Sequence, residues 1–205
     1  MTLWAKPCFA VVCALAMLIL VACGSSPSVR YYTLTSLPAA AVSSAATAGR
    51  QEIIVIGPVE LADYLDRPQI VKRSGPTTLS LLESDRWAGS LRSDLARIMV
   101  DNFAKQLTPR GYLVLPWEAT GSAGGRIQVS IIRLEGAEQQ TVLLDALWAL
   151  HGWERGEPLA VGKEIIVEPV AAEGGAALVE AMSRALAELS RRIAVEAEKE
   201  LAPAG

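Results

Sequence analysis

The sequence of 205 residues is poor in the side chains on which many catalytic and metal sites depend. It has one histidine, His151, and three cysteines, of which Cys8 and Cys13 lie in an apolar N-terminal run. A catalytic triad needs a histidine beside both a nucleophile and a carboxylate, and a structural zinc ion needs four ligands, mostly cysteine or histidine. A lone histidine is more typical of a structural or surface position. We therefore expect neither a catalytic triad nor a thiol enzyme, and we predict no metal and no cofactor.

Other signals of chemistry are also missing. The sequence has no G-x-S-x-G nucleophile elbow, and its glycine-rich stretch Gly121–Gly125 lacks the lysine and spacing of a phosphate-binding loop. With 19 basic and 22 acidic residues, the chain has no excess of positive charge for nucleic acid. The pairs Asp63 with Asp66 and Glu83 with Asp85 would suit a glycosidase, but charged surface turns explain them equally well. We expect a binding or scaffolding protein and not an enzyme.

The apolar N-terminal run is the first informative feature that is present. Lys6 is the one charged side chain before Cys23, and Pro7–Ala22 contains none. This run is shorter than the roughly 20 residues that a membrane-spanning helix needs. It fits a secretory signal, which has a basic start, a short apolar stretch and a small residue at the cleavage site. We predict that residues 1–22 are a signal peptide; an uncleaved N-terminal anchor is the alternative.

The end of this run, Leu20–Cys23 (LVAC), resembles the lipobox of bacterial lipoproteins. The resemblance implies that the Cys23 thiol carries lipid, palmitate among its acyl chains, and that residues 23–29 form a lipidated tether. Ordinary cleavage is the alternative, but it would leave a reactive thiol in an oxidising compartment. Gly24 stands where an aspartate usually retains such proteins in the inner membrane. By the same resemblance, we expect a protein anchored in the outer membrane and facing the periplasm.

Hydrophobic periodicity predicts one α/β domain over residues 30–205, with α+β character. We expect a mixed β-sheet with a long antiparallel meander and two main helices packed on it. Strands are predicted at 30–37, 51–61, 77–83, 111–117, 126–136, 141–150 and 159–170, with a turn and a short strand within 64–73. For 141–150, a helix is the competing interpretation.

Two details of this prediction bear on the packing of the domain. We expect Gly57-Pro58 to end the continuous apolar run of the second strand, and Pro38–Gly49 to be a loop. The helices are predicted at 89–107 and 175–201, each with an apolar stripe at helical spacing. The stripes are Leu91, Leu95, Ile98, Met99 and Phe103 in the first helix, and Leu178, Met182, Leu186, Leu189 and Ile193 in the second.

The segment YLDRPQIVKR (Tyr64–Arg73), with VEL shortly before it, resembles the P-V-x-L…Y-L-x-R-P-Q-I-V-x-R segment of the transport auxiliary lipoproteins, the PqiC-like family. Arg30–Leu34, Asp85–Phe103 and Ala177–Ala194 resemble further segments of that family in the same order. The resemblance implies a compact mixed sheet with helices packed on it. It also implies a periplasm-facing outer-membrane lipoprotein that supports envelope integrity as part of a lipid transport system.

The partners that this resemblance implies are an MCE-domain protein together with either an inner-membrane permease and ATPase or a Pqi-type membrane protein. Some members of the family assemble as homo-oligomeric rings. We select Tyr64, Arg67, Pro68 and Gln69 as candidate contacts with a partner or a second copy, because tyrosine and arginine are enriched at interface hot spots. Alternatively, Pro68 only shapes a turn and Ile70 only fills the core. The alternative function is an assembly lipoprotein of the envelope that handles no lipid.

Overall fold

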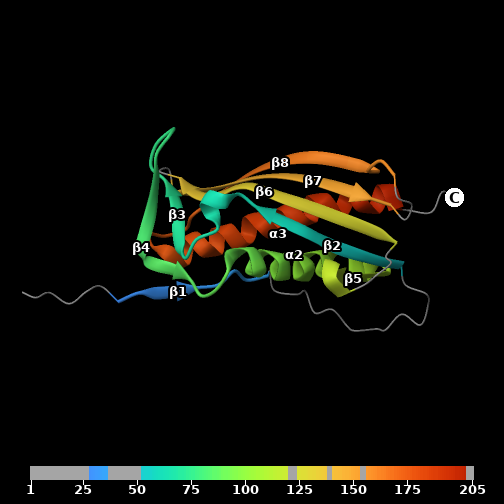
Figure 1. Cartoon of the computed structure of the whole chain (residues 1–205), viewed down its shortest axis with the longest axis horizontal. Helices are drawn as coiled ribbons and strands as arrows, with labels where there is room; N and C mark the ends of the chain where they lie inside the picture. The colour runs from blue at the N-terminus through green and yellow to red at the C-terminus, as the bar shows by residue number, and fades with distance from the viewer. Residues whose placement is uncertain (1–27, 37–51, 120–123, 138–139, 153–155, 202–205) are drawn as a thin grey trace, which may run out of the picture.

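The computed structural model describes residues 28–36, 52–119, 124–137, 140–152 and 156–201, and these form an eight-stranded mixed sheet with two long helices (Figure 1). The predicted signal peptide, Cys23 and the predicted loop Pro38–Gly49 lie outside the described residues. The strands are β1 (Arg30–Tyr32), β2 (Glu52–Leu61), β3 (Gln69–Arg73), β4 (Leu79–Trp87), β5 (Tyr112–Pro116), β6 (Gly125–Ala137), β7 (Thr141–His151) and β8 (Ala160–Pro169). The long helices are α2 (Leu91–Leu107) and α3 (Gly175–Leu201), and the short 3-10 helices are η1 (Asp63–Leu65), η2 (Thr108–Arg110) and η3 (Trp117–Ala119).

The strand β6 is the centre of the sheet. One side of β6 pairs along its length with β7, and β7 pairs with β8, both antiparallel. The other side of β6 is parallel to β2 over its first half and meets β3 only where Lys72 lies beside Gly136. Beyond β6 the sheet therefore divides into two arms, β2–β5 and β3–β4–β1. Among the described strands, the margins of the sheet are β8, β5 and β1.

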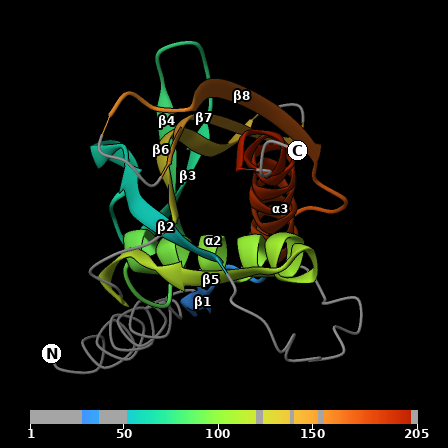
Figure 2. The same cartoon turned by 90° about the vertical axis from the view of Figure 1, so that its right-hand side faces the viewer.

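The sheet curls around the two helices, so that α2 and α3 lie on its concave side (Figure 2). Helix α3 packs against β7 and β8, α2 packs against β2 and β5, and the two helices contact each other. Every residue of the two predicted apolar stripes is buried, which confirms that these stripes hold the helices to the sheet. The mixed α/β class and the two helices on a sheet are confirmed. No helix in the described segments is long and apolar enough to cross a membrane.

The segment 141–150 is a strand, as preferred from the sequence, and not a helix. Its alternate residues Val142, Leu144, Ala146, Trp148 and Leu150 are buried, which is the pattern of a strand with one face on the core. The predicted meander of three long antiparallel strands, β6, β7 and β8, is also confirmed.

Two strand predictions need correction. The first strand ends at Tyr32 and not at residue 37, because Leu34 leaves the sheet and is buried against the helices. Its amide donates to the Asp94 carboxylate of α2 at 2.6 Å. The predicted strand over 51–61 is confirmed, but its apolar run does not end at Gly57-Pro58, since β2 continues to Leu61 with a register shift against β6. Gly57 has a φ of 130°, and a Cβ there would lie 2.9 Å from Cβ of Trp117, so glycine makes a bulge possible where a larger residue would clash.

Candidate functional site

The motif that carries the family resemblance is the connection from β2 to β3. After β2, the chain forms η1, then the exposed residues Asp66, Arg67 and Pro68, and then enters β3. Backbone hydrogen bonds join Ala62 to Ile131 of β6 at 3.0 Å, and Pro68 to Trp87 of β4 at 2.8 Å. In addition, Arg92 of α2 forms an ion pair with Asp66 at 3.0 Å. Three separate elements therefore hold this turn in place. We call residues 64–69 the motif turn.

Both ends of the motif converge on Glu135, a carboxylate of β6 whose side chain is 0% exposed. From β3, Arg73 donates to Oε1 at 2.5 Å and to Oε2 at 3.2 Å. Arg133 donates twice to Oε1, at 2.7 and 2.9 Å, and the Tyr64 hydroxyl donates to Oε2 at 3.0 Å. A buried carboxylate is tolerated when such charge-assisted hydrogen bonds satisfy it. We call Glu135, Tyr64, Arg73 and Arg133 the Glu135 cluster.

The electrostatics of the Glu135 cluster follow from this geometry. Burial by itself would raise the pKa of Glu135, but the hydrogen bonds from Arg73, Arg133 and Tyr64 hold that pKa below its usual value. For Tyr64, burial together with the charge of Glu135 and the hydrogen bond to it raises the pKa to about 12. The carboxylate is therefore ionised and the phenol is protonated across the neutral pH range. Both groups are fixed parts of the fold and neither is poised to exchange a proton.

The four predicted contact residues lie together in this turn, but they play different structural parts. Tyr64 is half-buried, and its hydroxyl is directed inward to Glu135 and to the carbonyl of Ile132 at 3.2 Å. Gln69 is half-buried at the start of β3, whereas Arg67 and Pro68 are exposed. Within the described residues, the Arg67 guanidinium has no hydrogen-bond acceptor. The turn thus presents a cation and a proline ring on a base fixed by the Glu135 cluster.

Sequence reasoning missed Glu135 and Arg133. A signal was present, because Arg133 and Glu135 are two apart and so lie on one face of a strand that is otherwise rich in apolar residues. Charged residues inside such a strand are rarely buried unless they are paired. The sequence does not reveal which distant residues complete the cluster.

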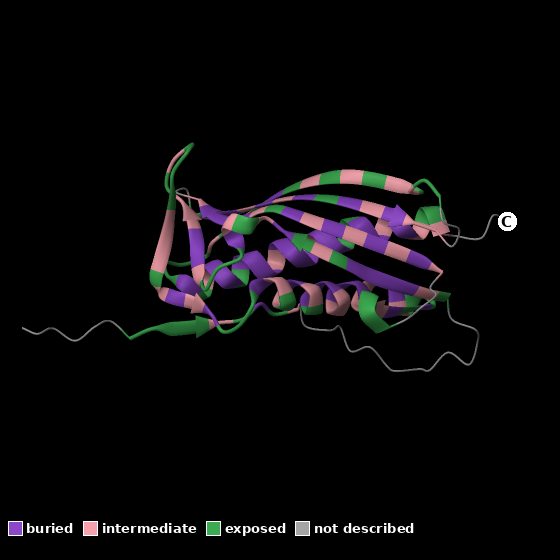
Figure 3. Ribbon diagram, in the orientation of Figure 1, coloured by how far each residue is buried: buried purple, intermediate pink, exposed green. Residues whose placement is uncertain are grey.

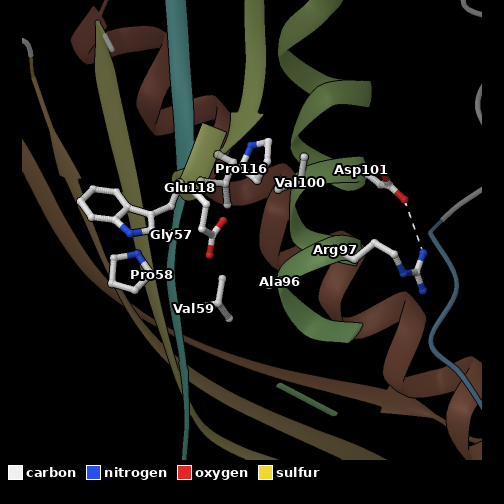
Figure 4. A pocket seen from close by; sticks show the side chains of 11 residues that line it. Gly57, Pro58, Val59, Ala96, Arg97, Val100, Asp101, Pro116 and Glu118 are labelled. Carbon is white, nitrogen blue, oxygen red and sulfur yellow. Dashed lines mark ion pairs between the residues drawn. The ribbon is translucent and has the colours of Figure 1, made fainter. Parts of the chain in front are cut away.

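A concave feature lies between β2, α2 and η3, with a volume of about 340 Å³ (Figure 4). Trp117 is one of its lining residues, and the Arg126 guanidinium lies 5.4 Å from the centre of the Trp117 ring, within the range of a cation–π contact. Arg97 and Asp101, on its α2 side, form an ion pair at 3.6 Å and so satisfy each other. The remaining lining is mostly apolar: Ile56, Gly57, Pro58, Val59, Ala96, Val100, Pro116, Trp117 and Glu118.

Two further candidates for chemistry, His151 and Asp85, have structural partners. His151 is half-buried with Nε2 2.8 Å from Oε1 of Gln128, and burial together with the charge of Arg126 lowers its pKa. Asp85 accepts hydrogen bonds from Arg30 at 2.8 Å and from Tyr32 at 3.0 Å. In the described part of the chain, no group of three or more histidine, cysteine, aspartate or glutamate side chains is arranged to hold a metal ion.

Proteins of known structure share this arrangement of a curled sheet on two helices. One uncharacterized protein is similar with a TM-score of 0.70 and 18% identity, over 83% of this chain and 99% of that one. Protein XCC0632 from Xanthomonas campestris is similar with a TM-score of 0.63 and 17% identity, over 84% of this chain and 95% of that one. At these identities the likeness establishes a common fold. Comparison with curated proteins finds no match.

The family follows from the sequence match. Residues 32–194 match the family model of the ABC-type transport auxiliary lipoprotein component. The match spans most of the chain and includes the motif turn, the Glu135 cluster, α2 and most of α3. The protein therefore belongs to the family of auxiliary lipoprotein components of ABC-type transport.

Proposed function

We propose that this protein is the outer-membrane-anchored, periplasm-facing lipoprotein subunit of an MCE-type or ABC lipid transport system that links the two membranes and supports envelope integrity. The observation that carries the proposal is the family match over residues 32–194. The lipobox-like Leu20–Cys23 immediately before that region supports it, because a lipid on Cys23 would supply the anchor. Gly24 supports export to the outer membrane on the same grounds.

The position of β1 supports a definite orientation of the domain on the membrane. The seven residues 24–30 lead from Cys23 to the start of β1, and a chain of that length reaches roughly 25 Å when fully extended. The strand β1 lies at the same end of the molecule as β3, β4 and the start of α3, while α3 ends at the opposite end (Figure 1). An anchor on Cys23 would keep the β1 end near the membrane. The opposite end would then project into the periplasm.

A transport role gives this anchored position a physical purpose. Each CH₂ group of a lipid that is exposed to water costs about 0.8 kcal/mol, so lipids do not cross the periplasm unshielded. In the proposed system, an MCE-domain protein shields the lipid, and an inner-membrane permease and ATPase or a Pqi-type membrane protein supplies it. This lipoprotein would hold the far end of that path at the outer membrane.

The motif turn is the proposed contact with the transport partner or with a neighbouring copy in a ring. Arg67 and Pro68 are exposed there and would make the contact, with Gln69 beside them. Tyr64 would act as a positioning residue, because its hydroxyl bonds to Glu135 of β6. A proline ring on a rigid base costs little conformational entropy to bind, whereas immobilising the arginine side chain costs about 0.5–1.5 kcal/mol that its contacts must exceed.

The proposal is tested on the full-length protein in its native bacterium. We expect radiolabelled palmitate to enter the wild type but not the Cys23→Ser variant, and only the wild type to fractionate with outer membranes. We also expect an MCE-domain protein and co-extracted lipid to purify with the wild type. Failure of Cys23→Ser to change labelling and fractionation would overturn the anchor. Protein partners that purify without lipid would instead support the alternative role in envelope assembly.

The contact residues are tested in the same purification. Arg67→Ala should reduce recovery of the partner while the thermal midpoint of unfolding stays within error of the wild type. Arg191→Ala is the matched control, since it removes an exposed arginine from α3. Equal recovery with both variants would refute the assignment of the motif turn as the contact.

A further inference from the structure

The strand β1 is exposed although it carries an aromatic side chain. Tyr31 is 65% exposed, and Val29, just before the strand, is 41% exposed. Figure 3 shows β1 as an exposed margin of the sheet, and within the described residues it pairs only with β4. Single exposed apolar residues are common on protein surfaces, so the surroundings of these two must decide what they do.

The inner face of β1 is occupied by the protein itself. Arg30 and Tyr32 donate to the Asp85 carboxylate of β4 at 2.8 and 3.0 Å. Gly175, at the start of α3, closes this face, because a Cβ on it would lie 2.8 Å from Cγ of Asp85. Successive side chains of a strand point to opposite faces. Tyr31 therefore points outward, away from α3.

A cation lies beside Tyr31 on the same outward face. In the parallel register of β1 with β4, Tyr31 is the partner of Arg86, and paired residues share a face. Arg86 donates through Nε to the carbonyl of Glu83 at 3.4 Å, and within the described residues its terminal nitrogens have no acceptor. An aromatic ring with a cation beside it suits a membrane interface, where tyrosine lies among the headgroups and arginine reaches their phosphates.

The charge of this end of the molecule differs from that of the other end. The strands β1, β3 and β4 carry four basic and two acidic side chains, on a chain whose formal net charge is −3. At the opposite end, between the start of β2 and the end of α3, a concave surface of about 580 Å³ is lined by Glu52, Glu157 and Glu200 and by no basic residue. An anionic surface would attract the first end and repel the second.

We propose that the outward face of β1 docks directly on the phospholipid headgroups of the membrane that holds the anchor, with the Tyr31 ring among the headgroups and Arg86 on an anionic phosphate. This inference rests on the proposed lipid at Cys23. The eight residues 24–31 reach roughly 28 Å when fully extended, so the anchor keeps Tyr31 within reach of the membrane. Because docking is then intramolecular, weak contacts are sufficient to fix the orientation of the domain.

The test uses the purified lipidated protein in phospholipid vesicles, with an environment-sensitive fluorophore on one introduced cysteine. Val29→Cys places the fluorophore beside Tyr31. Val161→Cys is the matched control, since it also replaces an exposed valine but lies on β8. When the vesicles contain phosphatidylglycerol, emission from residue 29 should brighten and move to shorter wavelength, while emission from residue 161 should not change. High salt should reverse the response, because it screens the charges.

Substitutions in the Val29→Cys protein test the two groups separately. Arg86→Gln should lower the ratio of docked to undocked protein about fivefold, the effect of one arginine near an anionic membrane surface. Arg191→Gln is the control, because it removes an exposed arginine of α3. Tyr31→Ser should also weaken docking, whereas Tyr31→Trp should retain it, since tryptophan favours the membrane interface as tyrosine does.

The outcomes separate docking from the anchor and from a protein contact. A fluorophore at residue 29 that stays in water, or an equal response at residues 29 and 161, would overturn the proposal. So would a response that appears only after envelope proteins are added, which would assign β1 to a protein partner. Palmitate that enters the protein while residue 29 stays in water would overturn docking alone and leave the anchor of the proposed function standing.

Discussion

The motif turn and the strand β8 both depart from the usual arrangement of polar side chains outside and apolar side chains inside. At the motif turn, the charged side chain of Glu135 is completely buried. On β8, the aliphatic side chains of Val161, Ile165 and Val167 are more than half exposed. The first departure is balanced inside the chain, because Arg73 and Arg133 surround the carboxylate with donors. Within the described residues, nothing covers the second.

This difference shows what each region contributes. A buried charge that is fully hydrogen-bonded fixes the geometry of the segments that supply its partners, so the Glu135 cluster sets the shape of the motif turn. An exposed aliphatic side chain adds little to the stability of the monomer, since it gains its free energy only when another surface covers it. Substitutions at the first region should therefore change folding, and substitutions at the second should change association.

The largest effect is expected from removing the buried carboxylate. Glu135→Ala leaves two arginines facing each other and removes one of the two acceptors of the Tyr64 hydroxyl, and breaking a buried ion pair in this way costs about 3–5 kcal/mol. Arg73 and Arg133 retain 25% and 33% exposure, which places our expectation at the lower end of that range. Urea denaturation measures the loss.

Glu164→Ala is the matched control for that experiment. It also removes one glutamate that is paired with an arginine, but both side chains are partly exposed, at 24% and 41%. Such a pair contributes about 1 kcal/mol or less. Equal losses of unfolding free energy in the two variants would contradict the role assigned to the Glu135 cluster.

Two neighbouring isoleucines of β8 give the next largest contrast. Ile166 is 3% exposed and Ile165 is 56% exposed, because they lie on opposite faces of the strand. Ile166→Ala should lower the unfolding free energy by about 2–5 kcal/mol through the cavity that it leaves. Ile165→Ala should change the unfolding free energy by only about 0.5 kcal/mol or less, because truncating an exposed side chain leaves no cavity.

These two variants are compared by urea denaturation under the same conditions. An Ile165→Ala variant as unstable as Ile166→Ala would contradict the exposed position of Ile165.

Local patterns in the sequence were sufficient to predict much of the fold. The strands β6 and β7 show alternation, and the apolar stripes of α2 and α3 recur at helical spacing; both patterns depend only on residues that are close along the chain. The class of a mixed sheet with two helices followed from them. The bulge at Gly57 did not, because the residue that makes glycine necessary there, Trp117, is 60 positions away in the sequence.

The candidate site was harder to predict for the same reason. The motif drew attention to Tyr64 and Arg67, and both lie in the predicted turn. The carboxylate that positions Tyr64 is 71 residues away on β6, and Arg73 reaches it across 62 residues. The open edge of β8 is equally long-range information, since whether a strand lies at the margin of a sheet depends on the order of all the strands.

The smallest effect on stability is expected at Tyr64, the one uncharged hydrogen-bond donor of the Glu135 cluster. Tyr64→Phe keeps the aromatic ring and removes only the hydroxyl that donates to Glu135, so a loss of about 1.5–3 kcal/mol is expected for a hydrogen bond to a charged group. Tyr31→Phe is the control, because Tyr31 is 65% exposed, and it should leave stability unchanged.

The pH dependence of stability identifies this hydrogen bond more specifically. The pKa of Tyr64 is about 12 in the folded protein against an ordinary value of 10.0. Between those two values the folded state holds a proton that the unfolded state has released, so the free energy of unfolding falls as the pH rises. The contribution is therefore complete below pH 10 and is lost as the pH approaches 12. Urea denaturation across this range should show a steeper decline for the wild type than for Tyr64→Phe; parallel declines would mean that Tyr64 does not titrate against Glu135.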